Sequence, residues 1–253
     1  MRGRSGATAP SPCFFVEKRA RMCYNERMKT YDTIGIIGAM DVEVERIARE
    51  MTDASSESFA RSAFTVGKID GQKAVVVQSG IGKVNAALVA SALVMRYGAD
   101  AVLMTGIAGT VTRDLHTLDA FVPTDFLQYD VSMPGCEDGF IDVLGEVYIP
   151  AAEELSAALA AASGAKRGTM ATGESFVAGE DAVRDVLRRF PRAMGVDMES
   201  AAVAQVCRRL GVPFACLKVI SDGCDDGEYA DFKQAAADKA VSGVLALVRG
   251  RRA

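Results

Sequence analysis

The sequence is poor in the residues that bind metals or form thiol-based catalytic pairs. Among 253 residues there is one histidine, His116, and the six cysteines include no C-x-x-C pair. Zinc sites built from cysteine and histidine require such a spacing, and a cysteine nucleophile requires a basic partner. We therefore expect no metal site, and free thiols in a reducing compartment.

Long apolar runs and concentrations of one charge are also missing. No apolar segment approaches the roughly 20 residues that span a bilayer. The short stretch "CFFV" is followed at once by charged residues, unlike the core of a signal peptide. The formal net charge is −4, with lysine and arginine scattered along the chain, which argues against a nucleic-acid partner. We expect a cytoplasmic protein that acts on a small molecule, with neither nucleic acid nor membrane as partner.

The sequence does contain a regular alternation of strand-like and helix-like segments. Apolar residues make up 49% of the chain, and the pattern starts after Met28. Residues 1–28 are therefore expected to be a disordered tail or a start-site artefact, and residues 29–253 one domain. Continuous apolar strands between amphipathic helices predict an α/β fold whose mixed sheet is covered on both faces. The predicted strands are 33–40, 63–69, 73–80, 100–106, 118–126, 165–173, 193–198 and 213–222, the predicted helices are 42–51, 84–97, 151–163, 181–190, 199–210 and 232–248, and 127–149 is a predicted surface or interface loop.

Three stretches resemble cofactor or metal motifs but fail at defining positions. "SGIGKVN" has Val77 where a P-loop requires its first glycine. "DGCDDG" places Cys224 at a ligand position of a calcium loop. "TGIAGTV" has only Gly106 and Gly109, so it is no dinucleotide fingerprint, and it is either a tight turn or a loop that approaches a ligand. We expect no cofactor.

Three carboxylates occupy positions where strands end or helices begin, which is where sheets of this kind place their ligand sites. Glu43 lies in an acidic helix start, Glu199 opens an apolar helix, and Asp222 ends an apolar strand. Ser221 precedes Asp222 and is suited to orient it by a hydrogen bond. Each acid also has a structural alternative: complementing the helix dipole for Glu43, helix capping for Glu199, and turn initiation for Asp222.

Six stretches, in chain order, resemble the signatures of bacterial 5′-methylthioadenosine/S-adenosylhomocysteine nucleosidases, members of the nucleoside phosphorylase superfamily. They are "IGIIGAMDVEVERI", "SGIGKVNAALVA", "TGIAGT", "ATGESFVAGE", "GVDMESAAVAQVC" and "VISDG". The resemblance runs from residue 33 to residue 248 and leaves out only the tail and 127–149. It implies a single three-layer α/β/α domain with a mixed, partly barrel-like sheet, assembled as a homodimer. The implied reaction is hydrolysis of the bond between adenine N9 and ribose C1′.

The resemblance implies a role for each carboxylate. Glu43 is implied to be the general base that polarises the attacking water. Asp222, supported by Ser221, is implied to carry a proton to adenine N7, which requires a raised pKa. Glu199 is implied to hold the ribose hydroxyls. These roles explain an acidic helix start, because the developing charge at C1′ is positive.

The remaining substrate-binding residues are implied in the same way. Val177 is implied to read the adenine edge through its backbone, and Phe176 to stack on the ring. Met40 and Met198 are implied to line the ribose and the 5′-thio pocket, and Tyr229 to act as a lid. For these side chains the alternative is a plain place in the core. The loop "TGIAG" contributes Ile107 and Gly109 to the same site.

The sequence departs from the family at two positions. Ile107 stands where well-known members have a serine that helps to hold the water, and Lys218 stands where many have arginine. Phosphorylases of the superfamily bind phosphate through an arginine and a serine, and the matching positions here are Met104 and Ile107. Burying a phosphate dianion against apolar side chains is costly, so water is the expected nucleophile and Lys218 the expected ion-pair partner of Glu43.

Two other functions remain open at the sequence level. One is a related nucleosidase for another 5′-substituted nucleoside, such as a futalosine-type compound. The other is a nucleoside-binding sensor that kept the pocket and lost turnover. The carboxylate trio favours an enzyme, because a protein that only binds has no need of an acid facing C1′.

Overall fold

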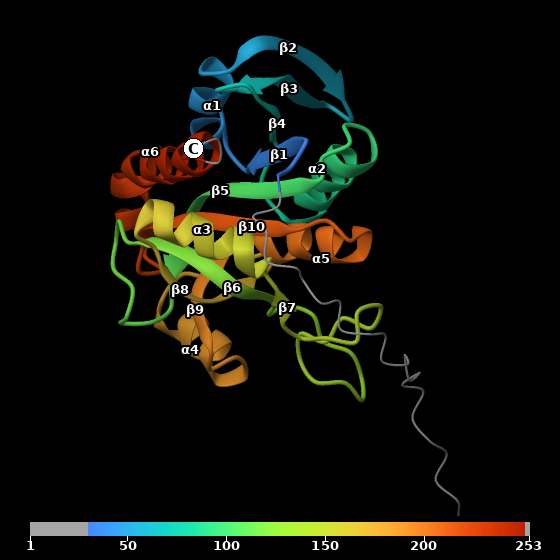
Figure 1. Ribbon diagram of the computed structural model, residues 1–253. Helices are drawn as coiled ribbons and strands as arrows, with labels where there is room; N and C mark the ends of the chain where they lie inside the picture. Colours follow the sequence, from blue (N-terminus) through green and yellow to red (C-terminus); the bar gives the residue numbers. More distant parts are fainter. Residues whose placement is uncertain (1–29, 251–253) are drawn as a thin grey trace, which may run out of the picture.

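The computed structural model describes residues 30–250, which form the α/β body drawn in colour in Figure 1. The predicted tail, residues 1–28, lies outside the described residues. The strands are β1 (Thr33–Gly38), β2 (Thr52–Phe59), β3 (Ser62–Ile69), β4 (Gln72–Gln78), β5 (Ala101–Thr110), β6 (Ala120–Gln128), β7 (Ile149–Pro150), β8 (Lys166–Thr172), β9 (Ala193–Asp197) and β10 (Phe214–Asp222). The α-helices are α1 (Glu45–Arg49), α2 (Lys83–Met95), α3 (Glu153–Ser163), α4 (Glu180–Arg189), α5 (Ser200–Leu210) and α6 (Asp226–Gly250), and a 3₁₀ turn covers Asp41–Glu43.

All of these strands belong to one mixed sheet that closes on itself over part of its width. The order is β10-β6-β8-β9-β5-β1-β4-β3-β2, with β7 paired to β6. An additional parallel pairing joins β10 to β5, so β5, β10, β6, β8 and β9 form a closed barrel. β1 and β4 pair in parallel, whereas β3 and β2 extend the sheet antiparallel. This topology confirms the predicted mixed, partly barrel-like sheet.

Helices cover both faces of the sheet, which confirms the predicted three layers. One core cluster joins the inner faces of α3 and α6 to residues of β1, β5 and β10, such as Leu103 and Leu217. A second cluster joins α2 and α5 to the other side chains of the same strands, such as Val102 and Cys216. The strands are apolar on both faces because both faces are covered. None of the described helices is long and apolar enough to cross a membrane.

The segment after β1 differs from the prediction. The expected helix 42–51 is a 3₁₀ turn followed by the short helix α1, and the chain then continues as strand β2, which the sequence did not predict. The sequence "TDASSESF" of β2 is polar and exposed along its whole length. A strand without alternating burial carries no period-two signal, so only its pairing with β3 reveals it.

Two further boundaries are corrected by the structure. "TGIAGT" is neither a turn nor a loop but the second half of β5, where it pairs with β10 and β9. α6 begins at Asp226 rather than at 232, so Tyr229 lies on its first turns. The end of β5 is extended by barrel pairing with segments far away in the chain, which no local pattern encodes.

Candidate active site

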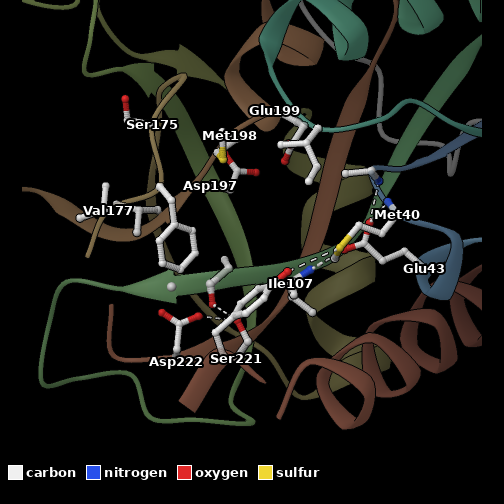
Figure 2. Close-up of a pocket in the computed structure, with 17 residues that line it drawn as sticks. Met40, Glu43, Ile107, Ser175, Val177, Asp197, Met198, Glu199, Ser221 and Asp222 are labelled. Atoms are coloured by element: carbon white, nitrogen blue, oxygen red, sulfur yellow. Dashed lines mark hydrogen bonds between the residues drawn. The ribbon is translucent and has the colours of Figure 1, made fainter. Parts of the chain in front are cut away.

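One pocket gathers all of the predicted site residues. Its lining comes from the ends of β1, β5, β9 and β10, from the loop after β8 and from the start of α6. The empty space among its lining residues, including solvent at its open side, is about 640 Å³. Figure 2 shows carboxylates approaching this space from several sides. The predicted residues that line the pocket are Met40, Glu43, Ile107, Gly109, Phe176, Val177, Met198, Glu199, Ser221, Asp222 and Tyr229.

Glu43 is buried and held by three backbone N–H groups. Its Oε2 accepts hydrogen bonds from Ala39 N at 2.6 Å and Met40 N at 2.9 Å, and its Oε1 accepts one from Ile107 N at 3.1 Å. Burial raises the pKa of Glu43, while Lys218 and these N–H groups oppose part of the rise. Glu43 therefore accepts from backbone N–H groups at the start of its own turn and also reaches across to β5 at the pocket.

Asp222 is fixed at the end of β10 by two hydrogen bonds. Ser221 Oγ donates to Asp222 Oδ2 at 2.6 Å, and Cys224 N donates to Oδ1 at 2.8 Å. The second bond is the turn contact that the structural alternative predicted, so Asp222 starts a turn and lines the pocket at once. Burial raises the pKa of Asp222, and the bonds from Ser221 and Cys224 counteract it in part. A raised pKa favours the protonated form that donates a proton.

Glu199 stands at the N-cap of α5 but does not cap it. Its side chain makes no cap hydrogen bond, and its Oε1 instead accepts from Gly82 N at 2.9 Å, across the pocket mouth. The capping alternative is therefore wrong. Burial raises the pKa of Glu199 to about 7, with Lys218 opposing the rise and Asp197 adding to it.

Lys218 and Asp197 form a buried ion pair behind the pocket. Lys218 is 1% exposed, and its Nζ lies 3.1 Å from Asp197 Oδ2 and 3.9 Å from Glu199 Oε2. The prediction that Lys218 pairs with Glu43 is wrong, because the ion pairs that Lys218 makes are with these two acids. Burial alone would lower the pKa of Lys218, but the surrounding carboxylates, Asp197 first, outweigh burial and raise it.

Asp197 is the site residue that the sequence reasoning missed. Its Oδ1 accepts a 2.6 Å hydrogen bond from Thr172 Oγ1, and Ser200 N and Oγ donate to the same carboxylate. A signal was present, because an acid and a lysine each lay inside an apolar segment predicted to be a strand. Two opposite charges that are both buried have to meet.

The walls of the pocket are apolar and aromatic. Phe176 is 45% exposed, and its ring meets that of Tyr229 edge to face with centroids 5.6 Å apart. Phe176 is therefore not a core residue. Met40 and Tyr229 pack on the core and line the pocket as well, with Tyr229 Oη 3.7 Å from Met40 Sδ. Ile107 is buried and faces the same space.

The charge of the pocket is strongly one-sided. Four of its lining residues are acids, namely Glu43, Asp197, Glu199 and Asp222, and no lysine or arginine of the described chain belongs to the lining. Among the described residues one lysine or arginine is buried, Lys218, which lies behind the acids and forms ion pairs with two of them. Such a site favours positive charge and disfavours an anion. It suits a reaction in which a sugar ring becomes cationic and a leaving group takes up a proton.

Comparison with known proteins assigns the fold and the site to a class. A family model described as the phosphorylase superfamily matches residues 33–249, so the chain belongs to that superfamily. The 5′-methylthioadenosine/S-adenosylhomocysteine nucleosidase of Shewanella piezotolerans is 34% identical over 208 residues, which cover 79% of this chain and 90% of the relative. Within the superfamily, the chain belongs to the family of 5′-methylthioadenosine/S-adenosylhomocysteine nucleosidases, which confirms the resemblance seen in the sequence.

Solved structures agree with this assignment. The nucleosidase of Colwellia psychrerythraea in complex with adenine has a TM-score of 0.83 and 32% identity, covering 87% of this chain and 96% of that one. The futalosine hydrolase of Helicobacter pylori has a TM-score of 0.82 and 28% identity, covering 87% and 98%. The fold is thus shared by enzymes for at least two kinds of 5′-substituted nucleoside.

Proposed function

We propose that this protein hydrolyses the N-glycosidic bond of 5′-methylthioadenosine and S-adenosylhomocysteine, releasing adenine and the 5-thio-ribose product. The observation that carries the proposal is the convergence of Glu43, Glu199 and Asp222 on one pocket without a lysine or arginine in its described lining. Membership of the nucleosidase family supports the same reaction.

In this proposal Asp222 protonates the leaving adenine at N7 and Glu43 activates the water. The raised pKa of Asp222 keeps a proton available for transfer. The raised pKa of Glu43 makes it a stronger base, and its three N–H donors stabilise the ionised form that the base needs. The two acids thus differ in the groups that surround them, which is how paired carboxylates divide acid and base roles.

Glu199 holds the ribose hydroxyls in this account, and the apolar walls hold the base and the 5′ group. Gly82 N donates to Oε1 of Glu199, and Oε2 lies 3.9 Å from Lys218 Nζ, beyond hydrogen-bond distance, so it can accept from the substrate. Phe176 and Val177 flank the adenine, and Met40, Met198 and Tyr229 surround the ribose and the 5′-thio substituent. These roles are supported by the presence of all of these residues in one lining.

We propose further that water, not phosphate, attacks C1′. The hydrogen-bond donor of Ile107 is its backbone N–H, which already donates to Glu43 Oε1. Met104 is fully buried in the core cluster of α2 and α5. Neither side chain offers a donor to a phosphate, and a dianion would face four carboxylates.

The experiment is a comparison of substrates with the purified full chain. Base release from 5′-methylthioadenosine, S-adenosylhomocysteine and a futalosine is measured by chromatography under identical conditions. We expect the two adenosine thioethers to be cleaved with the higher kcat/KM. Cleavage of the futalosine alone would instead support the second candidate function, a futalosine-type nucleosidase. The likeness to the Helicobacter pylori enzyme is the reason for including this substrate. Binding without base release over hours would identify a sensor.

We also propose a homodimer built on α2. Val84, Leu88 and Met95 expose 78%, 48% and 76% of their surface on this helix, and an apolar stripe of this kind is typical of an interface. The segment 127–149 is proposed to complete the contact, in which the two copies are related by a twofold axis.

The cell compartment and pathway are proposed on chemical grounds. The cytoplasm is supported by three buried cysteines of the described chain that form no disulfide, Cys207, Cys216 and Cys224. The reaction fits nucleoside catabolism and methionine salvage, because its substrates are adenosine thioethers.

A further inference from the structure

The loop that lines the base side of the pocket is held mainly by residues outside it. We call residues 173–177, between β8 and α4, the base loop. Ser175, Phe176 and Val177 line the pocket from this loop, and Ser175 and Phe176 are exposed. Val177 anchors the end of the loop in an apolar cluster, whereas residues 174–176 are exposed, so the position of this middle part depends on contacts from neighbouring elements.

Tyr129, directly after β6, holds the base loop at two points. Its ring lies over Gly173, where a Cβ would come within 2.2 Å of the ring carbon Cζ. Its hydroxyl donates a 2.7 Å hydrogen bond to Ser175 O, next to the two predicted adenine contacts. Burial raises the pKa of Tyr129 to about 12, so the hydroxyl keeps the proton that it donates. Tyr129 is 7% exposed, and this packing limits its freedom to leave the loop.

Asp130, the next residue, links the base loop to the start of α2. Its Oδ2 accepts from Glu174 N at 2.9 Å and its Oδ1 accepts from Lys83 Nζ at 2.6 Å. Lys83 in turn donates through its backbone N to Glu174 Oε1 at 2.9 Å and through Nζ to Gln128 Oε1 at 2.9 Å. Asp130, Lys83 and Glu174 thus form a closed ring of contacts.

The same helix start also fixes the ribose side of the pocket. Gly82 N donates to Glu199 Oε1, and the next N–H, that of Lys83, donates to Glu174 Oε1. Two successive amides at the start of α2 therefore hold a carboxylate of the pocket lining, Glu199, and a carboxylate of the base loop, Glu174. A displacement of this segment changes the spacing between the base loop and Glu199.

We propose that Tyr129, Asp130 and Lys83 are positioning residues that set the base loop for adenine, and we call them the base-loop clasp. The inference rests on the proposed function, because it assigns the base loop to the purine. The clasp acts through the backbone of Glu174 and Ser175 and the carboxylate of Glu174, and it does not touch the reacting atoms. Its loss should weaken affinity for the base and leave affinity for the sugar product unchanged.

The test is calorimetric binding of adenine and of 5-methylthioribose, each alone, to the full chain and to Tyr129→Phe and Asp130→Ala. We expect adenine to bind roughly three- to tenfold more weakly to each variant, the scale of one lost hydrogen bond, and 5-methylthioribose to bind as before. Tyr148→Phe is the matched control, because Tyr148 belongs to the same 127–149 segment but packs on Arg192, 4.3 Å from the ring centroid.

Three results would overturn the inference: unchanged adenine affinity in both variants, an equal loss in Tyr148→Phe, or an equal loss for 5-methylthioribose. Wild-type protein that binds no adenine would instead reject the proposed function. In that case hydrogen exchange of the ligand-free protein still tests whether the clasp holds the base loop. The Glu174 amide should exchange faster in Asp130→Ala, and an unchanged rate would reject the clasp itself.

Discussion

At the scale of single residues, the position of Glu43 depends on the lack of a side chain at Gly106. Gly106 lies beside Glu43, and a Cβ at this position would come within 2.6 Å of Glu43 Oε1. The absence of a side chain at 106 therefore allows Glu43 to reach the N–H of Ile107. Within the motif "TGIAG", Gly106 is therefore the residue that allows the Glu43 carboxylate to lie close to the backbone of β5.

Gly106→Ala should consequently damage catalysis more than folding. The added methyl group displaces the Glu43 carboxylate from its three donors, and a misplacement of about 1 Å in a catalytic group costs on the order of 10²-fold in rate. Steady-state kinetics and the melting temperature are measured together. A kcat within about twofold of wild type would show that Glu43 does not need its present position.

The two proposed acid/base residues should be separable from binding. Glu43→Gln and Asp222→Asn are each expected to lower kcat by at least about 10²-fold, the usual scale for one acid/base partner, while nucleoside binding persists. Glu199→Gln should weaken binding as well, because it loses the charged acceptor for the ribose hydroxyls. Near-normal turnover in either of the first two variants would contradict the mechanism.

Glu199 should also make the stability of the ligand-free protein depend on pH. Burial raises its pKa from 4.5 to about 7 in the folded state, so the folded state binds the proton more tightly than the unfolded state. The resulting stabilisation is complete below about pH 4.5 and is lost as the pH rises through about 7. As the pH rises through this range, the melting temperature of the wild-type protein should therefore fall relative to that of Glu199→Gln. A difference that stays constant with pH would show that Glu199 is not perturbed.

At the scale of elements, the sequence predicted those whose pattern is local and strong. The apolar strands around Ile36, Leu103 and Val219 and the helices on both faces appear where periodicity placed them. β2 was missed because it is polar and exposed, and the end of β5 because its glycines indicate a turn while barrel closure makes a strand.

The candidate site was predicted more completely than the fold boundaries, for a physical reason. Glu43, Glu199 and Asp222 stand at element ends, where a carboxylate is visible against an apolar background. Asp197, the partner of Lys218, was not found. Its strand, β9, and the strand of Lys218, β10, both pair with β5, and only this barrel arrangement brings the two charges together.

The exposed stripe of α2 leads to a prediction about assembly. Val84→Asp and Met95→Asp should each shift the protein from dimer to monomer in sedimentation, because both side chains are exposed in the protomer and a buried charge opposes association. Ala162→Asp, on the exposed face of α3, is the control and should remain a dimer. Monomeric wild-type protein at micromolar concentration would remove the proposed interface.

At the scale of the whole molecule, the closed barrel and the charge distribution serve one pocket. Closure of β10 on β5 brings Asp222 beside Gly109, and β9 adds Asp197 and the start of α5 at the same end. Acids from three parts of the chain thus line a space with no lysine or arginine in its described lining, and the buried Lys218 lies behind them. We propose that this arrangement stabilises a cationic sugar and disfavours an anionic nucleophile.

Base release from 5′-methylthioadenosine in phosphate-free buffer, repeated with phosphate added, tests this account most directly. The predicted result is adenine and 5-methylthioribose at the same rate in both buffers, because water attacks C1′ in a pocket that repels phosphate. A rate that depends on phosphate, with a 5-methylthioribose 1-phosphate product, would contradict the account and make the protein a phosphorylase.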